Sequence, residues 1–136
     1  MGERGTVGIL SPGIFTPIES HRDLIVWQKA MQLAAASYQL AKQMPKAEEY
    51  RLTSQLLRAA ASVPANIAEG HSRGTRKDYA NFVSIARGSL AETETFLLLA
   101  TTVQLLKQEE TQPALKLCQE ISKMLTALLT RLRDPL

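Results

Sequence analysis

A repeat of apolar and small side chains across residues 79–103 is the strongest constraint on the fold of this chain. The side chains recur at alternating spacings of three and four residues, at Tyr79, Phe82, Ala86, Ser89, Thr93, Phe96, Ala100 and Val103. Such a seam is typical of a long helix that packs lengthwise against other helices. Thr75 and Asp78 form a variant of the capping box at its start, so we expect a helix over residues 75–107.

Three further segments show helical periodicity and complete an all-α fold. We expect helices over residues 23–44, 46–70 and 112–133, and no segment alternates in the manner of a strand. Four helices of this length, joined by short turns, predict an antiparallel up-down-up-down four-helix bundle. The bundle would occupy residues 21–136, after a flexible N-terminal arm at residues 1–20 that is rich in glycine and proline.

Glycine, proline and capping residues set the expected details of these helices. Pro45 should stop the first helix, and Pro64 should kink the second without ending it. Gly70 is expected as the stop of the second helix, and Thr111 as the cap of the fourth. Gly88, in the middle of the third helix, predicts a close approach of another helix.

The first expected helix is apolar on two faces. One stripe consists of Leu24, Trp27, Met31, Ala34, Tyr38 and Ala41, and the other of Val26, Ala30, Leu33, Leu40 and Met44. A helix that is apolar on two sides must bury both of them. The bundle core would cover one stripe, and we expect a neighbouring subunit to cover the other.

Composition narrows the class of protein further. The chain has 136 residues, with 16 Lys and Arg against 13 Asp and Glu, so one mildly basic domain of charge +3 is expected. The single cysteine, Cys118, cannot form an intrachain disulfide, and the start of the chain has no secretory pattern. We therefore expect a reducing, cytoplasmic location. No apolar run approaches the ~20 residues of a membrane span, so we expect no membrane contact.

No set of residues indicates catalysis, a metal or a cofactor. The two histidines, His21 and His71, do not follow a glutamate by three residues, as ligands of a di-iron bundle would. Cys118 lies on an apolar face, which indicates a buried and inert thiol. Glu92 and Glu94 are two residues apart, so their side chains diverge on a helix. We therefore expect no enzymatic activity and no cofactor.

Polar side chains gather on one face of the second expected helix, and an antiparallel third helix would bring others, Arg87 among them, to the same level. Burial of an Arg or a Glu is tolerable only when it is paired, so we expect Arg58 to pair with Glu92 or Glu69. We predict a polar network, inside the bundle or at a subunit interface, of Arg58, Ser62, Asn66, Glu69, Ser89 and Glu92. The alternative is a solvated face that lines a groove.

A basic cluster follows the second helix and includes His71, Arg73, Arg76 and Lys77, with Arg87 three turns later. Arg76 and Lys77 lie at the start of a helix, where the helix dipole disfavours cations. Contact with phosphates is a natural reason for their presence, because Arg and Lys dominate such contacts. A solvated basic loop without a ligand is the alternative.

Residues 23–100 resemble the family of four-helix-bundle proteins that is named after proteins encoded in intervening sequences of bacterial 23S ribosomal RNA genes. The resemblance is carried mainly by Ser62-Val63-Pro64, Asn66-Ile67-Ala68-Glu69-Gly70 and Gly88-Ser89-Leu90-Ala91-Glu92. It implies a small cytoplasmic bundle that forms a ring-like homo-oligomer, most simply a pentamer. It also implies kinship with accessory proteins of diversity-generating retroelements, which bind nucleic acid and a reverse transcriptase. No enzymatic activity is attached to the family.

Two functions remain open from the sequence. The first is a non-catalytic, oligomeric protein that binds RNA or DNA through Arg73, Arg76, Lys77 and Arg87. The second is a structural or adaptor module with no role in nucleic-acid binding, which docks a protein partner on the outer face of the first helix.

Overall fold

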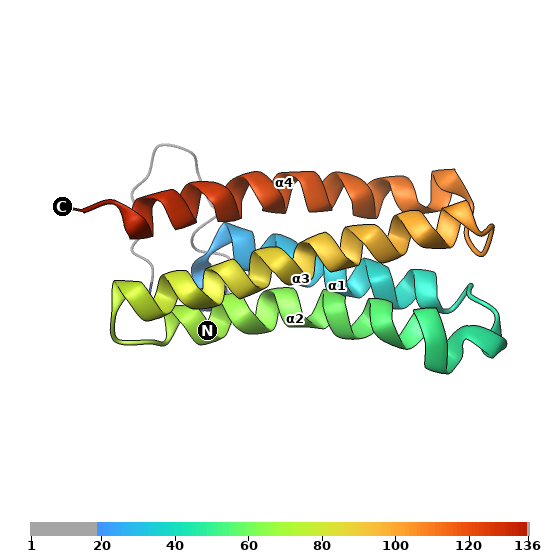
Figure 1. Cartoon of the computed structure of the whole chain (residues 1–136), viewed down its shortest axis with the longest axis horizontal. Coiled ribbons are helices and arrows are strands. Elements are labelled where there is room, and N and C mark those ends of the chain that lie inside the picture. The colour runs from blue at the N-terminus through green and yellow to red at the C-terminus, as the bar shows by residue number, and fades with distance from the viewer. Residues whose placement is uncertain (1–18, 136) are drawn as a thin grey trace.

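The computed structural model describes residues 19–135, and four long helices account for most of them (Figure 1). They are α1 (Ile25–Ala41), α2 (Ser54–His71), α3 (Arg76–Thr102) and α4 (Gln108–Arg133). The helices lie side by side along the long axis of the molecule, and the described residues contain no strand. The prediction of an all-α fold with four helices is confirmed. The arm predicted for residues 1–20 falls mainly outside the described residues.

The core lies along the shared axis of the four helices. Helix α1 packs against α2 and α4, and α3 packs against the same two helices. All four helices contribute fully buried side chains, among them Leu33, Leu56, Ile67, Leu97, Ile121 and Leu125. Each such side chain contributes about 1.5–3 kcal/mol relative to exposure. None of the helices in the described part of the chain is long and apolar enough to cross a membrane.

The two apolar stripes of α1 have different environments. Val26, Ala30 and Leu33 belong to the buried core. On the other stripe, Met31 is 46% exposed and Tyr38 is 53% exposed. The bundle core therefore covers the first stripe and contacts Leu24 and Trp27 of the second, and a subunit that covers the exposed Met31 and Tyr38 remains a prediction.

The second helix begins later than expected. Residues 46–48 form a 3₁₀ turn and residues 49–53 a π-type turn, and the backbone leaves the helical region at Arg51 (φ −118°, ψ −112°). Helix α2 starts only at Ser54. The apolar stripe begins at Leu52, so the residues after Pro45 have little apolar surface with which to join the core. The helix continues through Pro64, as predicted.

Gly70 and Gly88 have roles that differ from those expected. Gly70 lies inside α2, which ends one residue later, so it is not the stop. A Cβ at Gly70 would lie 2.8 Å from the Cβ of Phe82 and 3.0 Å from Cδ1 of Tyr79. A Cβ at Gly88 would meet no atom within 4 Å. The close approach of α2 and α3 therefore requires Gly70, and within one chain nothing requires Gly88.

Thr75 caps α3 as expected, because its Oγ1 accepts from the backbone N–H of Asp78 at 3.1 Å.

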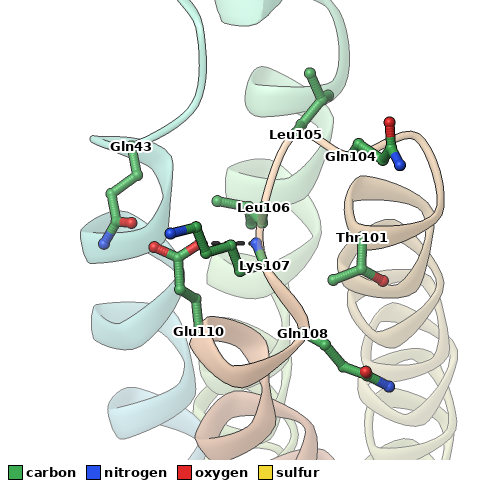
Figure 2. A pocket seen from close by; sticks show the side chains of 8 residues that line it. All are labelled: Gln43, Thr101, Gln104, Leu105, Leu106, Lys107, Gln108 and Glu110. Carbon is green, nitrogen blue, oxygen red and sulfur yellow. Dashed lines mark hydrogen bonds between the residues drawn. The ribbon is translucent and has the colours of Figure 1, made fainter.

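The connection between α3 and α4 differs from the prediction (Figure 2). Helix α3 ends at Thr102 rather than residue 107, and Gln104 has a φ of 64° in the left-handed region. Helix α4 then begins at Gln108, where the Glu110 carboxylate accepts from the N–H of Lys107 at 2.7 Å.

Thr111 is not the cap of the fourth helix. It is fully buried in the first turns of α4, and its hydroxyl donates to the carbonyl of Gln108 at 3.1 Å. The expected start at residue 112 was therefore four residues late. The cap is made by the Lys107 backbone and the Glu110 side chain instead, so Thr111 is free to fill the core.

Candidate nucleic-acid interface

Cationic side chains from α3, from α4 and from the segments that precede α1 and follow α2 meet at one end of the bundle, which we call the basic end. The start of α1, the turn between α2 and α3, and the C-terminus of α4 lie together there (Figure 1). The cationic residues of the basic end are Arg22, Arg73, Arg76, Lys77, Arg131 and Arg133, with His21 and His71 beside them. Arg22, Lys77 and Arg133 are exposed, and no ion pair holds them within residues 19–135.

Two of the acids at this end are engaged by the fold, whereas Asp78 and Asp134 are exposed beside Lys77 and Arg133. The buried carboxylate of Asp23 accepts from the backbone N–H groups of Glu19 at 3.0 Å and Ser20 at 3.3 Å. Glu69 forms an ion pair with Arg73, with 3.1 Å between Oε2 and Nη2. The Glu69 carboxylate therefore serves Arg73, and no ion pair joins Asp23, Asp78 or Asp134 to a cation within residues 19–135.

Arg73 is held in place from two sides. Its guanidinium carbon lies 4.7 Å from the centre of the Phe82 ring, while Glu69 holds one nitrogen. A guanidinium over an aromatic face is favourable and keeps its planar fork oriented. Arg73 is thus presented at the surface, about half exposed, with one side still open to a ligand.

Arg76 has a structural partner that explains its position. Its guanidinium donates to the backbone carbonyl of Arg131, in the last turn of α4. The last carbonyls of a helix carry partial negative charge, so a cation is favourable there. Arg76 therefore stabilises the end of α4, although it lies at the unfavourable end of α3.

The two histidines of the chain both lie at the basic end, as the sequence predicted for His71 but not for His21. The His21 ring contacts Trp27 edge-on at 5.1 Å between centroids, and the His71 ring contacts Tyr79 at 5.7 Å. Burial lowers the pKa of His21 most, and the positive charges of His71 and Arg22 lower the pKa further. Burial first, and these two neighbours second, therefore oppose protonation of His21.

The structure does not bring Arg87 into the cluster. Lys77 is exposed in the first turn of α3, but Arg87 follows 10 residues later, about 15 Å along the helix. Arg87 lines a separate hollow between α3 and α4, with Lys123 and Glu94. Of the four predicted phosphate contacts, Arg73, Arg76 and Lys77 lie together at the basic end.

The predicted polar network is partly assembled. The hydroxyls of Ser62 and Ser89 lie 2.8 Å apart, and the Asn66 amide donates to the Ser62 hydroxyl at 2.9 Å and to its carbonyl at 2.8 Å. Arg58 and Glu92 are exposed, and no ion pair joins them in the described part of the chain. Because Glu69 pairs with Arg73, the network that links α2 and α3 consists of uncharged groups.

The single cysteine, Cys118, is a free thiol buried in the core. Burial raises the pKa of the Cys118 thiol to about 12, and the nearby negative charge of Glu94 contributes. A thiol with such a pKa is protonated and unreactive at neutral pH. Residues 19–135 contain no group of three His, Cys, Asp or Glu side chains that could hold a metal.

A hollow of about 560 Å³ lies at the opposite end of the molecule (Figure 2). The side chains of Lys107 and Glu110 extend across it toward Gln43. Its other lining residues are Thr101, Gln104, Leu105, Leu106 and Gln108. Its acid, Glu110, is used to cap α4, so the hollow offers no acid–base pair.

These features define a small all-helical protein with a hydrogen-bonded seam and cations at one end. The chain belongs to the 23S rRNA-intervening sequence protein family, whose model matches residues 22–127. The resemblance seen in the sequence is confirmed, and the match extends beyond residue 100 into α4. The fold is similar to the crystal structure of a protein of unknown function from the S23 ribosomal protein family of Bacteroides thetaiotaomicron. The two are 27% identical, with a TM-score of 0.72, over 77% of this chain and 98% of that chain. The search of curated proteins found no match.

Proposed function

We propose that this chain is a non-catalytic protein that binds RNA or DNA through the phosphates, at the basic end of the bundle. The observation that carries the proposal is the exposure of Arg22, Lys77 and Arg133 at one end, with no ion pair to an acid within residues 19–135. Arg73 adds an oriented guanidinium beside them. Arg and Lys side chains make many of the contacts to phosphates, and such binding requires no catalytic group.

The proposal includes self-assembly of antiparallel up-down-up-down bundles into a ring-like homo-oligomer, most simply a pentamer. Contacts that tie distant parts of the chain support this order of helices, such as the 3.0 Å ion pair between Lys29 and Glu120. Exposed apolar side chains remain for contact between subunits, namely Tyr38, Ile85, Leu98, Leu99 and Val103. Each chain has a charge of only +3, so assembly would multiply the positive field that attracts nucleic acid.

A reducing, cytoplasmic location is part of the proposal and is supported by the free thiol of Cys118.

A second candidate function is an adaptor that binds a protein, such as a reverse transcriptase, with no role for nucleic acid. The half-exposed Met31 and Tyr38 on α1 favour it, because such side chains suit a protein interface. Neutralising the basic end would leave this function intact.

The test is binding of a labelled structured RNA by fluorescence anisotropy across a series of salt concentrations. We expect affinity to fall steeply with salt, and a Lys77→Gln/Arg133→Gln variant to bind more weakly with a smaller salt slope, by about 0.7–0.9 per lost phosphate contact. Lys42→Gln/Lys46→Gln, at the opposite end, is the matched control and should change little. Absence of binding at any salt, or an equal effect of both variants, would refute the proposal. Light scattering measures the subunit count on the same samples.

A further inference from the structure

A hollow of about 340 Å³ lies between the start of α1 and the second half of α2, beside the basic end. It is lined by His21, Trp27, Met31, Ala34, Ala61, Pro64, Ala65 and Ala68. Apart from His21, every lining side chain is apolar, and none is acidic. The volume lies within the range of about 300–1,000 Å³ that small-molecule sites occupy.

Two aromatic rings form one wall of this hollow. Trp27 and His21 meet edge-on, with an interplanar angle of 69°, and both are half-buried, so part of each ring stays accessible. The facing α2 side chains are small, and Ala61 and Ala65 are exposed. A planar ring could therefore lie against Trp27 without a clash from α2.

An exposed cation lies beside the hollow. Arg22 follows His21 directly in the chain, while the nearby Asp23 carboxylate is buried and bonded to backbone N–H groups. A phosphate backbone that passes over the basic end would thus run close to the aromatic wall. Aromatic side chains next to cations are how proteins hold unpaired bases of single-stranded nucleic acid.

We infer that the hollow receives an unpaired nucleobase stacked on Trp27, so that the ligand of the basic end is single-stranded nucleic acid and not a continuous duplex. The inference rests on the proposed function, because the phosphate contacts bring the strand to the hollow. In a continuous duplex the bases are stacked on one another and their faces cannot reach Trp27.

The experiment compares an oligouridylate with a blunt duplex of equal length, using the full chain and fluorescence anisotropy. Trp27 is the only tryptophan, so its emission reports the hollow directly. We expect the single strand to bind more tightly and to quench Trp27. Trp27→Leu should weaken single-strand binding about tenfold and leave duplex binding unchanged. Tyr50→Leu is the matched control, because Tyr50 is 87% exposed at the opposite end.

A second variant keeps the test decisive if Trp27→Leu does not fold. Ala65→Leu fills the hollow from an exposed position and should also weaken single-strand binding about tenfold, whereas Ala35→Leu, exposed on α1, should not. Absence of binding to both ligands would refute the proposed function. Equal or tighter duplex binding, or no change in Trp27 emission, would overturn this inference alone. Trp27 emission that responds to protein dilution but not to nucleic acid would show that a second copy covers the hollow, and would also overturn it.

Discussion

The guanidinium of Arg76, in the first turn of α3, donates a hydrogen bond to the backbone carbonyl of Arg131, in the last turn of α4. This contact places a cation on the negative end of the α4 dipole, at a carbonyl that also accepts from the backbone N–H of Asp134 at 3.3 Å. It joins two helix ends that are 55 residues apart in the chain.

Arg76→Ala should therefore reduce stability more than it reduces nucleic-acid binding. We expect a loss of about 1 kcal/mol in the free energy of unfolding, from the hydrogen bond and the dipole contact together. Urea unfolding measures this loss. Lys77→Ala is the control, because the neighbouring Lys77 ammonium donates no hydrogen bond in the described part of the chain. An equal loss for both variants would argue against the capping role.

The alanine variants of the two helical glycines should have opposite effects. Gly70→Ala introduces a Cβ 2.8 Å from that of Phe82, and we expect overpacking to cost about 1–3 kcal/mol. The Cβ that Gly88→Ala adds would meet no atom within 4 Å, so this variant should stabilise the helix by about 0.5–1 kcal/mol. Thermal unfolding of both variants checks the signs. A destabilised Gly88→Ala variant with a lower solution mass would instead reveal a subunit contact at this position.

Gln104 should be a position where glycine improves the protein. Its φ of 64° is unfavourable for a residue with a Cβ, and glycine adopts it freely. Gln104→Gly should raise the free energy of unfolding by about 0.5–1 kcal/mol. Gln104→Ala keeps the Cβ and is the control, for which no gain is expected. Urea unfolding compares the two variants. An equal gain in the free energy of unfolding for both would contradict the prediction.

Periodicity was sufficient to predict the helices, because spacings of three and four residues are a local property of the chain. The same reasoning placed Ser62 and Ser89 in one polar network, and the structure joins their hydroxyls at 2.8 Å. Helix ends were predicted less well. Thr111 has a hydroxyl that could cap a helix, but its side chain is buried in the core. The cap of α4 is formed at Lys107 instead.

The candidate site was predictable only in part, for a different reason. Arg73 and Lys77 lie in one short stretch, so the sequence itself places them together. His21 joins the basic end through tertiary packing alone, and no local pattern marks it. Arg76 was correctly singled out as unfavourable for its own helix, yet its partner in α4 could not be read from the sequence.

The hydrogen bond between Ser62 and Ser89 should couple α2 to α3. A double-mutant cycle with Ser62→Ala and Ser89→Ala should give a coupling energy of about 0.5–1.5 kcal/mol, because the 2.8 Å bond is partly buried. Thr95→Ala combined with Ser62→Ala is the control, since Thr95 bonds only within its own helix. A coupling energy near zero would mean that water satisfies these hydroxyls equally well.

The Cys118 thiol should make stability depend on alkaline pH. Burial raises its pKa from 9.0 to about 12 in the folded chain, so the unfolded thiol ionises first as the pH rises. The unfolded state then binds fewer protons than the folded state, and the free energy of unfolding falls with pH. No effect is expected below about pH 8, and above pH 9 the slope should approach about 1.4 kcal/mol per pH unit. The difference between the unmodified chain and Cys118→Ala, measured by urea unfolding from pH 7 to 10, isolates this contribution from that of the lysines. A difference that stays constant across this range would mean that the thiol ionises as readily in the folded chain as in the unfolded one.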